Sequence, residues 1–172
     1  LQDSALNAFV AGGKNIFLHT GLLISTETPQ QLRGVLAHEI GHIAGGHLTR
    51  MSQAYRDASN VASLGSILGL AAAIASGQPQ AAPTLVHGAG SIAQKTFLRH
   101  TRGQEAAADQ AAARYLIAIR EGPGGLLDFL RILKEKEAVS SDTIPIYLRT
   151  HPLTKDRIKF FEKPTSVPND IK

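Results

Sequence analysis

The sequence predicts an α+β fold that is mainly helical, with a small β-sheet or hairpin beside an amphipathic helix. Two short apolar runs near the N-terminus flank a pair of glycines, as in a β-hairpin. A capped run with helical spacing follows them, and a long Ala-rich helical run comes later in the chain. The 172 residues are 43% hydrophobic and 19% charged, which suffices for one buried core and is atypical of intrinsic disorder.

Residues 1–24 have the composition of strands. The two apolar runs cover residues 6–10 and 16–18. Gly12 and Gly13 lie between them and allow the positive φ angles that a hairpin turn needs. We therefore expect a β-hairpin at the start of the chain.

The first helix is marked by signals at its N-terminus. Thr28 suits the N-cap, Pro29 suits the first helical position, and Gln31 has the spacing of a capping box. Apolar residues then recur at helical spacing. We expect the helix to continue through the Gly45-Gly46 pair to about Arg56, although each glycine weakens it by roughly 1 kcal/mol.

Residues 58–94 contain no Asp, Glu, Lys or Arg. Their most apolar part, residues 61–75, is shorter than the stretch of about 20 apolar residues that crosses a membrane. Gly65 and Gly69 have the small-xxx-small spacing of closely packed helices. We expect a buried or flap-like helix followed by a mobile loop over residues 78–90. The alternative that the sequence leaves open is contact with a membrane surface through residues 58–76.

Further helices are predicted over residues 101–119, 126–136 and 156–162. Between the last two, residues 138–156 have the composition of a polar loop. We expect residues 1–163 to form one domain and residues 164–172 to form a loosely held C-terminal tail.

A pair of histidines on the first helix has the spacing of metal ligands. His38 and His42 are four residues apart, so that both imidazoles lie on one helix face and can hold a zinc ion. Glu39 lies beside the metal, where it can take a proton from the water that zinc activates. This HExxH pattern predicts one zinc per chain and hydrolytic chemistry.

A hydrolytic zinc needs a third protein ligand. A third histidine six residues after the second is excluded because Leu48 occupies that position. On a continuous helix His47 would point about 140° away from His42. Glu105 on the Ala-rich helix is the best candidate, and Asp109 one turn later can accept the ring N–H of a zinc-bound histidine.

The composition excludes other chemistries. The chain has no Cys, so that disulfides, a thiolate zinc cluster and a cysteine nucleophile are excluded. The net charge of +4 is spread thinly, and there is no Trp. Such a chain is poor material for stacking bases, and we expect no nucleic-acid partner.

The ordered set of motifs resembles the gluzincin metallopeptidases, the family that includes HtpX, the CAAX prenyl protease and BepA-like periplasmic proteases. The resemblance covers about residues 5–162 and rests on Asn7-Ala8-Phe9, Gly12-Gly13, Gly21-Leu22-Leu23, His38-Glu39-x-x-His42, Glu105-x-x-x-Asp109 and His151-Pro152-x-x-x-x-Arg157. It implies a zinc-dependent endopeptidase with a mostly helical fold and a small sheet beside the active-site helix.

The resemblance also implies roles for single residues. The metal ligands would be His38, His42 and Glu105. Glu39 would be the general base, and Asp109 would support the ligands from behind.

Two further positions and a strand follow from the resemblance. His151 and Arg157 match positions that approach the zinc and steady the transition state. An extended polypeptide substrate would pair as an added strand with an edge strand that maps onto Ile16, Phe17, Leu18, His19 and Thr20.

The resemblance implies a setting in the bacterial cell envelope. HtpX-like members carry clear membrane spans, and the sequence analysis finds none here, which favours the periplasmic branch. The substrates would be misfolded or unassembled envelope proteins, as in protein quality control. Members of this branch often continue into helical repeats that recruit clients, and we expect such a region outside this sequence.

We expect access to the zinc to be gated. Residues 58–94 lie between the two ligand-bearing helices, and a loop there could open. An imidazole from the loop of His151 that reached the fourth zinc position would displace the catalytic water. The alternative function is therefore a zinc-dependent chaperone or scaffold domain with gated or lost hydrolysis.

Overall fold

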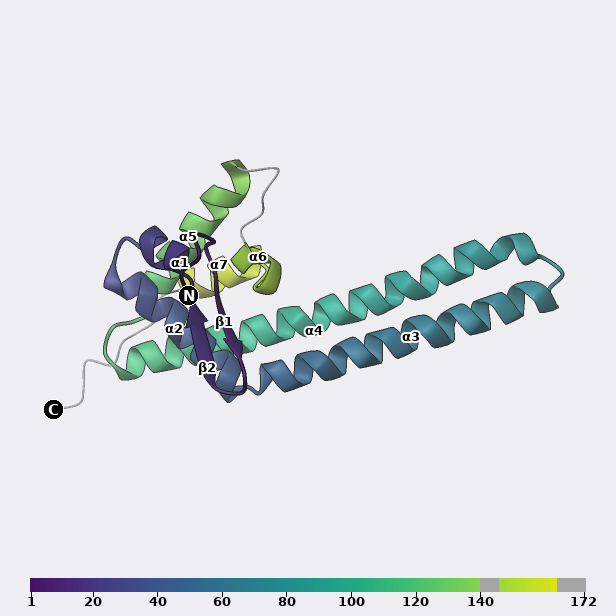
Figure 1. Cartoon of the computed structure of the whole chain (residues 1–172), viewed down its shortest axis with the longest axis horizontal. Coiled ribbons are helices and arrows are strands. Elements are labelled where there is room, and N and C mark those ends of the chain that lie inside the picture. The colour runs from purple at the N-terminus through teal and green to yellow at the C-terminus, as the bar shows by residue number, and fades with distance from the viewer. Residues whose placement is uncertain (140–145, 164–172) are drawn as a thin grey trace. The chain divides into compact units, whose positions relative to one another are not determined.

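The computed structural model describes residues 1–139 and 146–163, so that the expected tail over residues 164–172 lies outside the described part. The described elements in chain order are β1 (Ala8–Ala11), β2 (Asn15–Leu18), α1 (Thr20–Ser25), α2 (Pro29–Ala44), α3 (His47–Ala75), the 3₁₀ helix η1 (Pro79–Ala81), α4 (Ala82–Ala118), α5 (Gly124–Val139), α6 (Ile146–Thr150) and α7 (Lys155–Glu162) (Figure 1). The chain divides into two compact units, one of residues 49–103 and one of the remaining residues. The prediction of a mainly helical α+β fold is confirmed.

The predicted β-hairpin forms the sheet. β1 pairs antiparallel with β2, and Phe9 lies opposite Phe17 with the two rings stacked 5.3 Å apart. Gly12 and Gly13 make the turn at φ +57° and +91°, a region that L side chains rarely adopt. The expectation of strand over all of residues 1–24 is wrong at both ends, because residues 1–7 lie outside the strands. Residues 20–25 form α1 instead, which buries Leu22 completely in the core.

α2 begins as the sequence predicts. The side chain of Thr28 accepts a hydrogen bond from the backbone N–H of Gln31 at 3.3 Å, and Pro29 is the first helical residue. The side chain of Gln31 accepts in turn from the backbone N–H of Glu27 at 2.7 Å. These bonds satisfy N–H groups that the first turn of a helix leaves without intrahelical partners.

The end of α2 differs from the prediction. The helix stops at Ala44 and does not continue to Arg56, because Gly46 adopts a φ of +62° and interrupts the helical path. A new helix, α3, begins at His47. The interruption changes the direction of every side chain that follows it.

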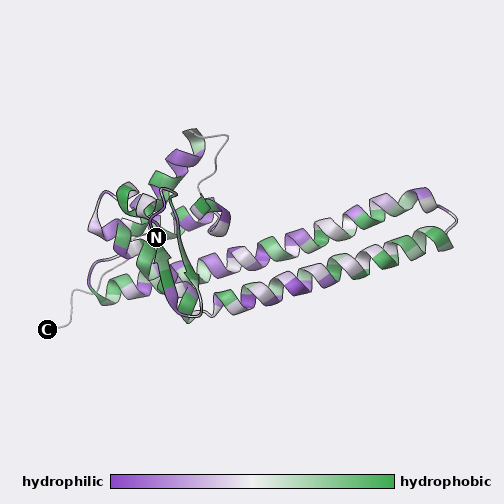
Figure 2. Ribbon diagram, in the orientation of Figure 1, coloured by the Kyte–Doolittle hydropathy of each residue, from purple (hydrophilic) through white to green (hydrophobic). Residues whose placement is uncertain are grey.

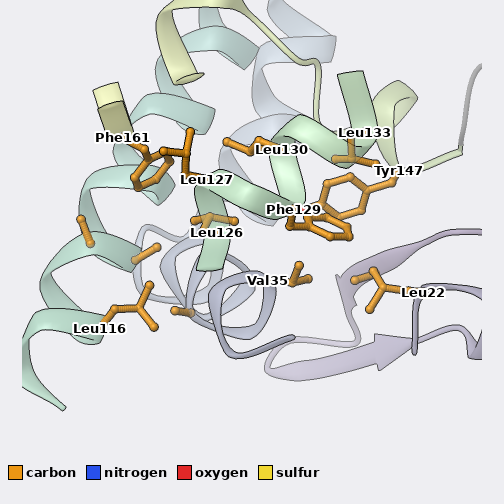
Figure 3. Close-up of a cluster of buried hydrophobic side chains, with 14 of the residues drawn as sticks. Leu22, Val35, Leu116, Leu126, Leu127, Phe129, Leu130, Leu133, Tyr147 and Phe161 are labelled. Carbon is orange, nitrogen blue, oxygen red and sulfur yellow. The ribbon is translucent and has the colours of Figure 1, made fainter. Parts of the chain in front are cut away.

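The core of the first unit lies where α5 packs across α2. Figure 3 shows leucines of α5 and α4 and aromatic side chains of α5, α6 and α7 gathered around Val35 of α2. The largest fully buried apolar side chains are Leu22, Val35, Leu126, Phe129, Leu130, Leu133 and Tyr147. This core holds α2 in place, and α2 contains the two predicted histidine ligands, His38 and His42.

The second unit is a hairpin of two long helices, the part of α3 after residue 48 and the part of α4 up to residue 103 (Figure 1). Residues 78–90 are mostly the beginning of α4, so that the expected loop there is wrong. α3 is largely exposed, which excludes the buried alternative of the expected buried or flap-like helix. By length and composition alone α3 could cross a membrane, contrary to the expectation that this segment is too short, and only 11% of its most apolar stretch is buried.

The C-terminal part contains one more helix than expected. Residues 146–150 of the predicted polar loop form α6, because burial of Tyr147 and Leu148 in the core favours an ordered turn. The part of that loop over residues 140–145 lies outside the described residues. α7 begins after Thr154, whose side chain accepts from the backbone N–H of Arg157.

The close packing of α2 on α4 generates a prediction. A Cβ at Gly41 would lie 2.8 Å from the backbone oxygen of Ala108, whereas a Cβ at Gly103 would meet no atom within 4 Å. We expect Gly41→Ala to destabilise the protein by about 1–3 kcal/mol through overpacking. Gly103→Ala should instead stabilise it by up to about 1 kcal/mol through helix propensity. Urea unfolding followed by circular dichroism compares the two, and equal stabilities would contradict the prediction.

Candidate metal centre

Two helices carry the predicted ligands to one place. His38, Glu39 and His42 lie on consecutive turns of α2, and Glu105 and Asp109 lie one turn apart on α4. Because Gly41 has no side chain, the backbone of α4 at residue 108 approaches α2 closely beside these residues. The fully buried side chains of His38 and Glu39 show that the site is inside the first unit.

Within the described residues, His38, His42, Glu105 and His151 form a group in which four donor atoms lie within 4.8 Å of one another. Nε2 of His38 is 3.0 Å from Nε2 of His42 and 3.4 Å from Oε2 of Glu105. Nε2 of His42 is 3.2 Å from Oε1 of Glu105. Nδ1 of His151 is 3.3 Å from Oε1 of Glu105 and 3.4 Å from Nε2 of His38.

These spacings fit the donor set of a zinc ion. Nitrogen and oxygen ligands lie about 2.0–2.2 Å from zinc, and tetrahedral geometry then separates the ligand atoms by about 3.3 Å. The five separations given above, measured to one or the other oxygen of Glu105, run from 3.0 to 3.4 Å, and all four donor atoms lie within 4.8 Å of one another. Neutral imidazoles and a carboxylate are also the ligand types that zinc takes in hydrolytic sites.

Glu39 lies next to this group without belonging to it. Its carboxylate is buried, and neither oxygen has a hydrogen-bond partner among the described residues. Oε1 of Glu39 is 3.5 Å from Nε2 of His151. A buried carboxylate without hydrogen bonds retains its full capacity to accept a proton from a nearby water.

Asp109 and Arg157 lie behind the donor group. Oδ1 of Asp109 is 2.9 Å from Nδ1 of His38, the ring nitrogen that faces away from the other donors. Arg157 donates to Asp109 through Nε at 2.7 Å and through Nη2 at 2.8 Å. Its Nη1 also lies 2.9 Å from Oε2 of Glu105. One guanidinium therefore compensates two buried carboxylates.

The electrostatics of the site reflect these contacts. Burial opposes the charged form of His38, but Asp109 and Glu105 outweigh it and raise the pKa of His38 to about 9. Burial prevails at His42 and lowers its pKa to about 4. Burial also opposes ionisation of Glu105, yet hydrogen bonds from His151, His38 and His42 hold the pKa of its carboxyl well below its usual range. At Asp109, burial is outweighed by the hydrogen bond from His38 and the charge of Arg157, which lower the pKa of that carboxyl. The acids are therefore ionised at neutral pH.

His151 reaches the site from the end of α6. It is 6% exposed, and its ring stacks on that of Tyr147 with the centroids 4.6 Å apart. The sequence analysis missed Tyr147. It lies four residues before His151, a spacing that would have indicated the contact if α6 had been recognised as a helix. Its buried hydroxyl has no hydrogen-bond partner among the described residues, and burial together with the charge of Glu39 raises the pKa of this hydroxyl well above its usual value.

The structure also corrects the placement of His47. The sequence analysis directs this side chain away from His42, because it assumes an unbroken helix. The break at Gly46 restarts the helix at His47, whose Nδ1 lies 2.9 Å from Nδ1 of His42. His47 is 4% exposed, and its backbone oxygen accepts from the side chain of Gln104 on α4 at 3.2 Å. It therefore holds the outer side of the His42 ring, as Asp109 holds that of His38.

The outer edge of β2, which was expected to pair with substrate, is partly occupied. The N-terminal amine of Leu1 donates to the backbone oxygen of Leu18 at 2.6 Å, and the N–H of Thr20 donates to the backbone oxygen of Leu1 at 3.0 Å. The backbone of Leu1 thus contacts this edge at residues 18–20. The backbone N–H and C=O groups of Ile16 point to the same outer edge, beyond Leu1. Those of Phe17 and His19 point towards β1.

The chain resembles known proteins over nearly its whole length. The sequence model of peptidase family M48 matches residues 1–165. A putative beta-barrel assembly-enhancing protease of Vibrio cholerae serotype O1 is 33% identical over 162 residues, which are 92% of this chain and 32% of the relative. The beta-barrel assembly-enhancing proteases of Yersinia pestis and Escherichia coli strain K12 are 33% and 32% identical over 161 residues, with the same coverage. The chain thus spans about a third of the length of these relatives.

The contact between Asp109 and His38 predicts a loss of metal affinity when the carboxylate is removed. We expect Asp109→Ala to weaken zinc binding about 10–100-fold, because the ligand ring loses the partner that orients it. Asp128→Ala, which removes an exposed carboxylate from α5, should leave the affinity unchanged. Competition with a coloured zinc chelator measures both, and equal affinities for the two variants would contradict the prediction.

His47 generates a parallel prediction for the second ligand. We expect His47→Ala to weaken zinc binding about 10-fold or more, because the ring of His42 loses the contact at its Nδ1. His87→Ala changes an exposed histidine of the second unit and is the matched control. If both variants bind zinc as tightly as the wild type, His47 has no orienting role.

Proposed function

The chain belongs to peptidase family M48, and from this premise we propose that it is a zinc-dependent endopeptidase domain of gluzincin type, with residues 1–163 as the catalytic domain. The observation that carries the proposal is the convergence of His38, His42 and Glu105 with Glu39 beside them. The separations of their donor atoms fit a zinc ion, and the buried carboxylate of Glu39 is available as a base. This combination supports hydrolysis of a peptide bond.

His38, His42 and Glu105 would hold one zinc ion per chain. Bound there, zinc would supply Lewis acidity, polarising the scissile carbonyl and making water more acidic. The chain's own residues prepare this site in advance. Asp109 contacts Nδ1 of His38 and orients its ring, and Arg157 compensates the charge of the neighbouring carboxylates. The ionised carboxylate of Glu105 is ready to bind a metal, whereas His38, whose pKa is about 9, would release a proton on binding.

Glu39 would be the general base. Its carboxylate takes a proton from the attacking water and then passes that proton to the amine of the leaving peptide. Arg157 was expected to stabilise the oxyanion. Its contacts with Asp109 and Glu105 support a positioning role instead, because its Nε, Nη1 and Nη2 atoms all lie at these carboxylates. His151 is the residue that could stabilise a developing oxyanion.

His151 also supports a gated resting state. Its Nδ1 stands among the donor atoms, where a fourth ligand would exclude the catalytic water. This observation favours, as a second candidate, a zinc-dependent chaperone or scaffold domain with gated or lost hydrolysis. In the gated peptidase, the segment with α6 moves when substrate binds, and hydrolysis begins only then.

We place the domain in the bacterial cell envelope, in the periplasm or at a membrane. The names of the relatives from Vibrio, Yersinia and Escherichia, which join protease activity to β-barrel assembly, support misfolded or unassembled envelope proteins as substrates. An extended segment of such a protein would pair along β2 from Ile16 to Thr20, and at residues 18–20 it would replace Leu1. The recruiting repeats are proposed to lie outside this sequence.

The role of Glu39 can be tested without disturbing the metal site. We expect Glu39→Gln to lower the cleavage rate of an unfolded protein about 100-fold or more while the zinc content stays near one per chain, because the amide cannot accept the proton. Glu135→Gln, at an exposed position of α5, should cleave like the wild type. Removal of zinc by a chelator should abolish cleavage by both active proteins. Wild-type cleavage by Glu39→Gln would exclude Glu39 as the base.

If His151 blocks the fourth zinc position, its removal should raise the cleavage rate, whereas removal of the Glu39 carboxylate lowers it. We expect His151→Ala to cleave an unfolded protein faster than the wild type while binding the same amount of zinc, because the fourth position becomes free for water. Cleavage assays and elemental analysis on the same preparations measure the two quantities. A slower variant with full zinc content would instead assign His151 to the transition state.

A further inference from the structure

The hairpin formed by residues 49–103 exposes large apolar side chains over most of its surface. Leu64, Ile67, Leu68 and Ile74 of α3 are each 61–68% exposed. Figure 2 shows the end of α3 next to the turn as predominantly hydrophobic. The other large apolar side chains exposed on this unit are Tyr55, Val61, Leu70, Leu85, Val86, Ile92 and Leu98.

The interior of the hairpin is made of small residues. Its buried apolar side chains are all alanines: Ala58, Ala73, Ala89 and Ala93. A Cβ at Gly65 would lie 2.6 Å from Cβ of Ala89, and one at Gly69 would lie 2.9 Å from Cβ of Leu85, so the helices pack closely at the glycines. Small residues between the helices and large apolar residues outside are the reverse of a water-soluble hairpin. They are the arrangement of helices packed in lipid.

Charge divides the hairpin into two zones. Residues 58–94 contain no Asp, Glu, Lys or Arg. The end away from the turn carries five basic side chains against the one acidic side chain of Asp57, and these basic residues are Arg50, Arg56, Lys95, Arg99 and Arg102. A basic zone next to an uncharged apolar zone is complementary to anionic headgroups above a hydrocarbon layer.

Two serine hydroxyls and the turn of the uncharged zone are hydrogen-bonded within the hairpin. The hydroxyl of Ser66 donates to the backbone oxygen of Ala62, and that of Ser76 donates to the backbone oxygen of Ala73. At the turn Gly77 has a φ of +68°, and the N–H groups of residues 76, 77 and 78 donate to carbonyls of the last turn of α3. Internal hydrogen bonding of this kind lowers the cost of leaving water.

We propose that residues 58–94 enter the apolar part of a lipid bilayer that carries anionic headgroups, with the basic zone at the level of those headgroups. The uncharged part of α3 is about 27 Å long, close to the hydrocarbon thickness of about 30 Å, and that of α4, about 20 Å long, covers about two thirds of it. The exposed apolar side chains, the small interior residues and the basic zone all belong to the hairpin and include none of the candidate metal ligands.

Flotation of the full chain with vesicles tests the proposal. We expect binding to vesicles of phosphatidylcholine mixed with phosphatidylglycerol, and weaker binding to phosphatidylcholine alone. The double variant Leu64→Gln with Leu68→Gln should weaken binding at least about tenfold, because it removes apolar area without changing charge. Ser59→Gln with Ser63→Gln, at exposed positions of the same helix, should bind like the wild type.

The basic zone is tested separately. Lys95→Gln and Arg99→Gln should each weaken binding to the anionic vesicles about fivefold and leave binding to phosphatidylcholine unchanged. Because the chain has no Trp, Leu68→Trp provides a single fluorophore whose emission should shift to the blue and be quenched by brominated lipid. Gln53→Trp, outside the uncharged zone, should not be quenched in this way.

Three results would overturn the proposal. They are absence of vesicle binding, equal binding by the two double variants, and lack of quenching at Leu68→Trp. Sedimentation equilibrium without lipid tests the alternative that a second copy of the chain binds the apolar surface. Self-association that Leu64→Gln with Leu68→Gln abolishes, in a chain that does not bind vesicles, would assign the apolar surface to a second copy of the chain.

Discussion

The rest of the site depends on the guanidinium of Arg157, whose positive charge compensates two buried carboxylates. It lies between Asp109 and Glu105, two carboxylates that are almost fully buried. Burial of an uncompensated charge costs several kcal/mol, whereas a bidentate contact to a guanidinium offsets much of that cost. With both acids ionised, Asp109 holds one nitrogen of His38 and leaves the other facing the metal position. The α7 helix, far from α2 in sequence, is thus part of the candidate metal site.

Close backbone packing is the second constraint. The helices α2 and α4 approach each other where Gly41 faces Ala108, and the ligands lie within one turn on either side of that contact. A wider separation would move Glu105 away from both histidines. α5 also packs on α2, where a Cβ at Gly34 would lie 2.8 Å from Leu126, so that packing between the helices sets the positions of the candidate ligands. A site prepared in this way requires little reorganisation to bind an ion.

The helix α4 belongs to both units, and its two halves are packed in opposite ways. In its later half, α4 buries acids against histidines and an arginine. In its earlier half, it packs Ala89 and Leu85 against the glycines of α3 and leaves large apolar side chains outside. The first arrangement depends on exact pairing of charges. The second depends on a surrounding that is itself apolar, which is why composition alone gave two opposing interpretations of residues 58–94.

Spacing along the chain predicted correctly those features that depend on a single helix or turn. The capped start of α2, the hairpin turn at Gly12 and Gly13, and the common faces of His38 with His42 and of Glu105 with Asp109 all follow from spacing along the chain. The break at Gly46 lay beyond this reasoning, because each glycine weakens a helix only slightly and packing decides whether it ends there. That break turned His47 towards His42.

The sequence by itself determined which residue types and spacings were available for a metal site on two helices. Only the tertiary structure decided that Arg157 faces two carboxylates, that Tyr147 supports His151, that Leu1 lies on the edge of β2, and that residues 58–94 expose their apolar side chains. The reason is physical. Periodicity fixes the direction of a side chain only relative to the axis of its own helix, whereas contacts between distant segments depend on how those axes pack.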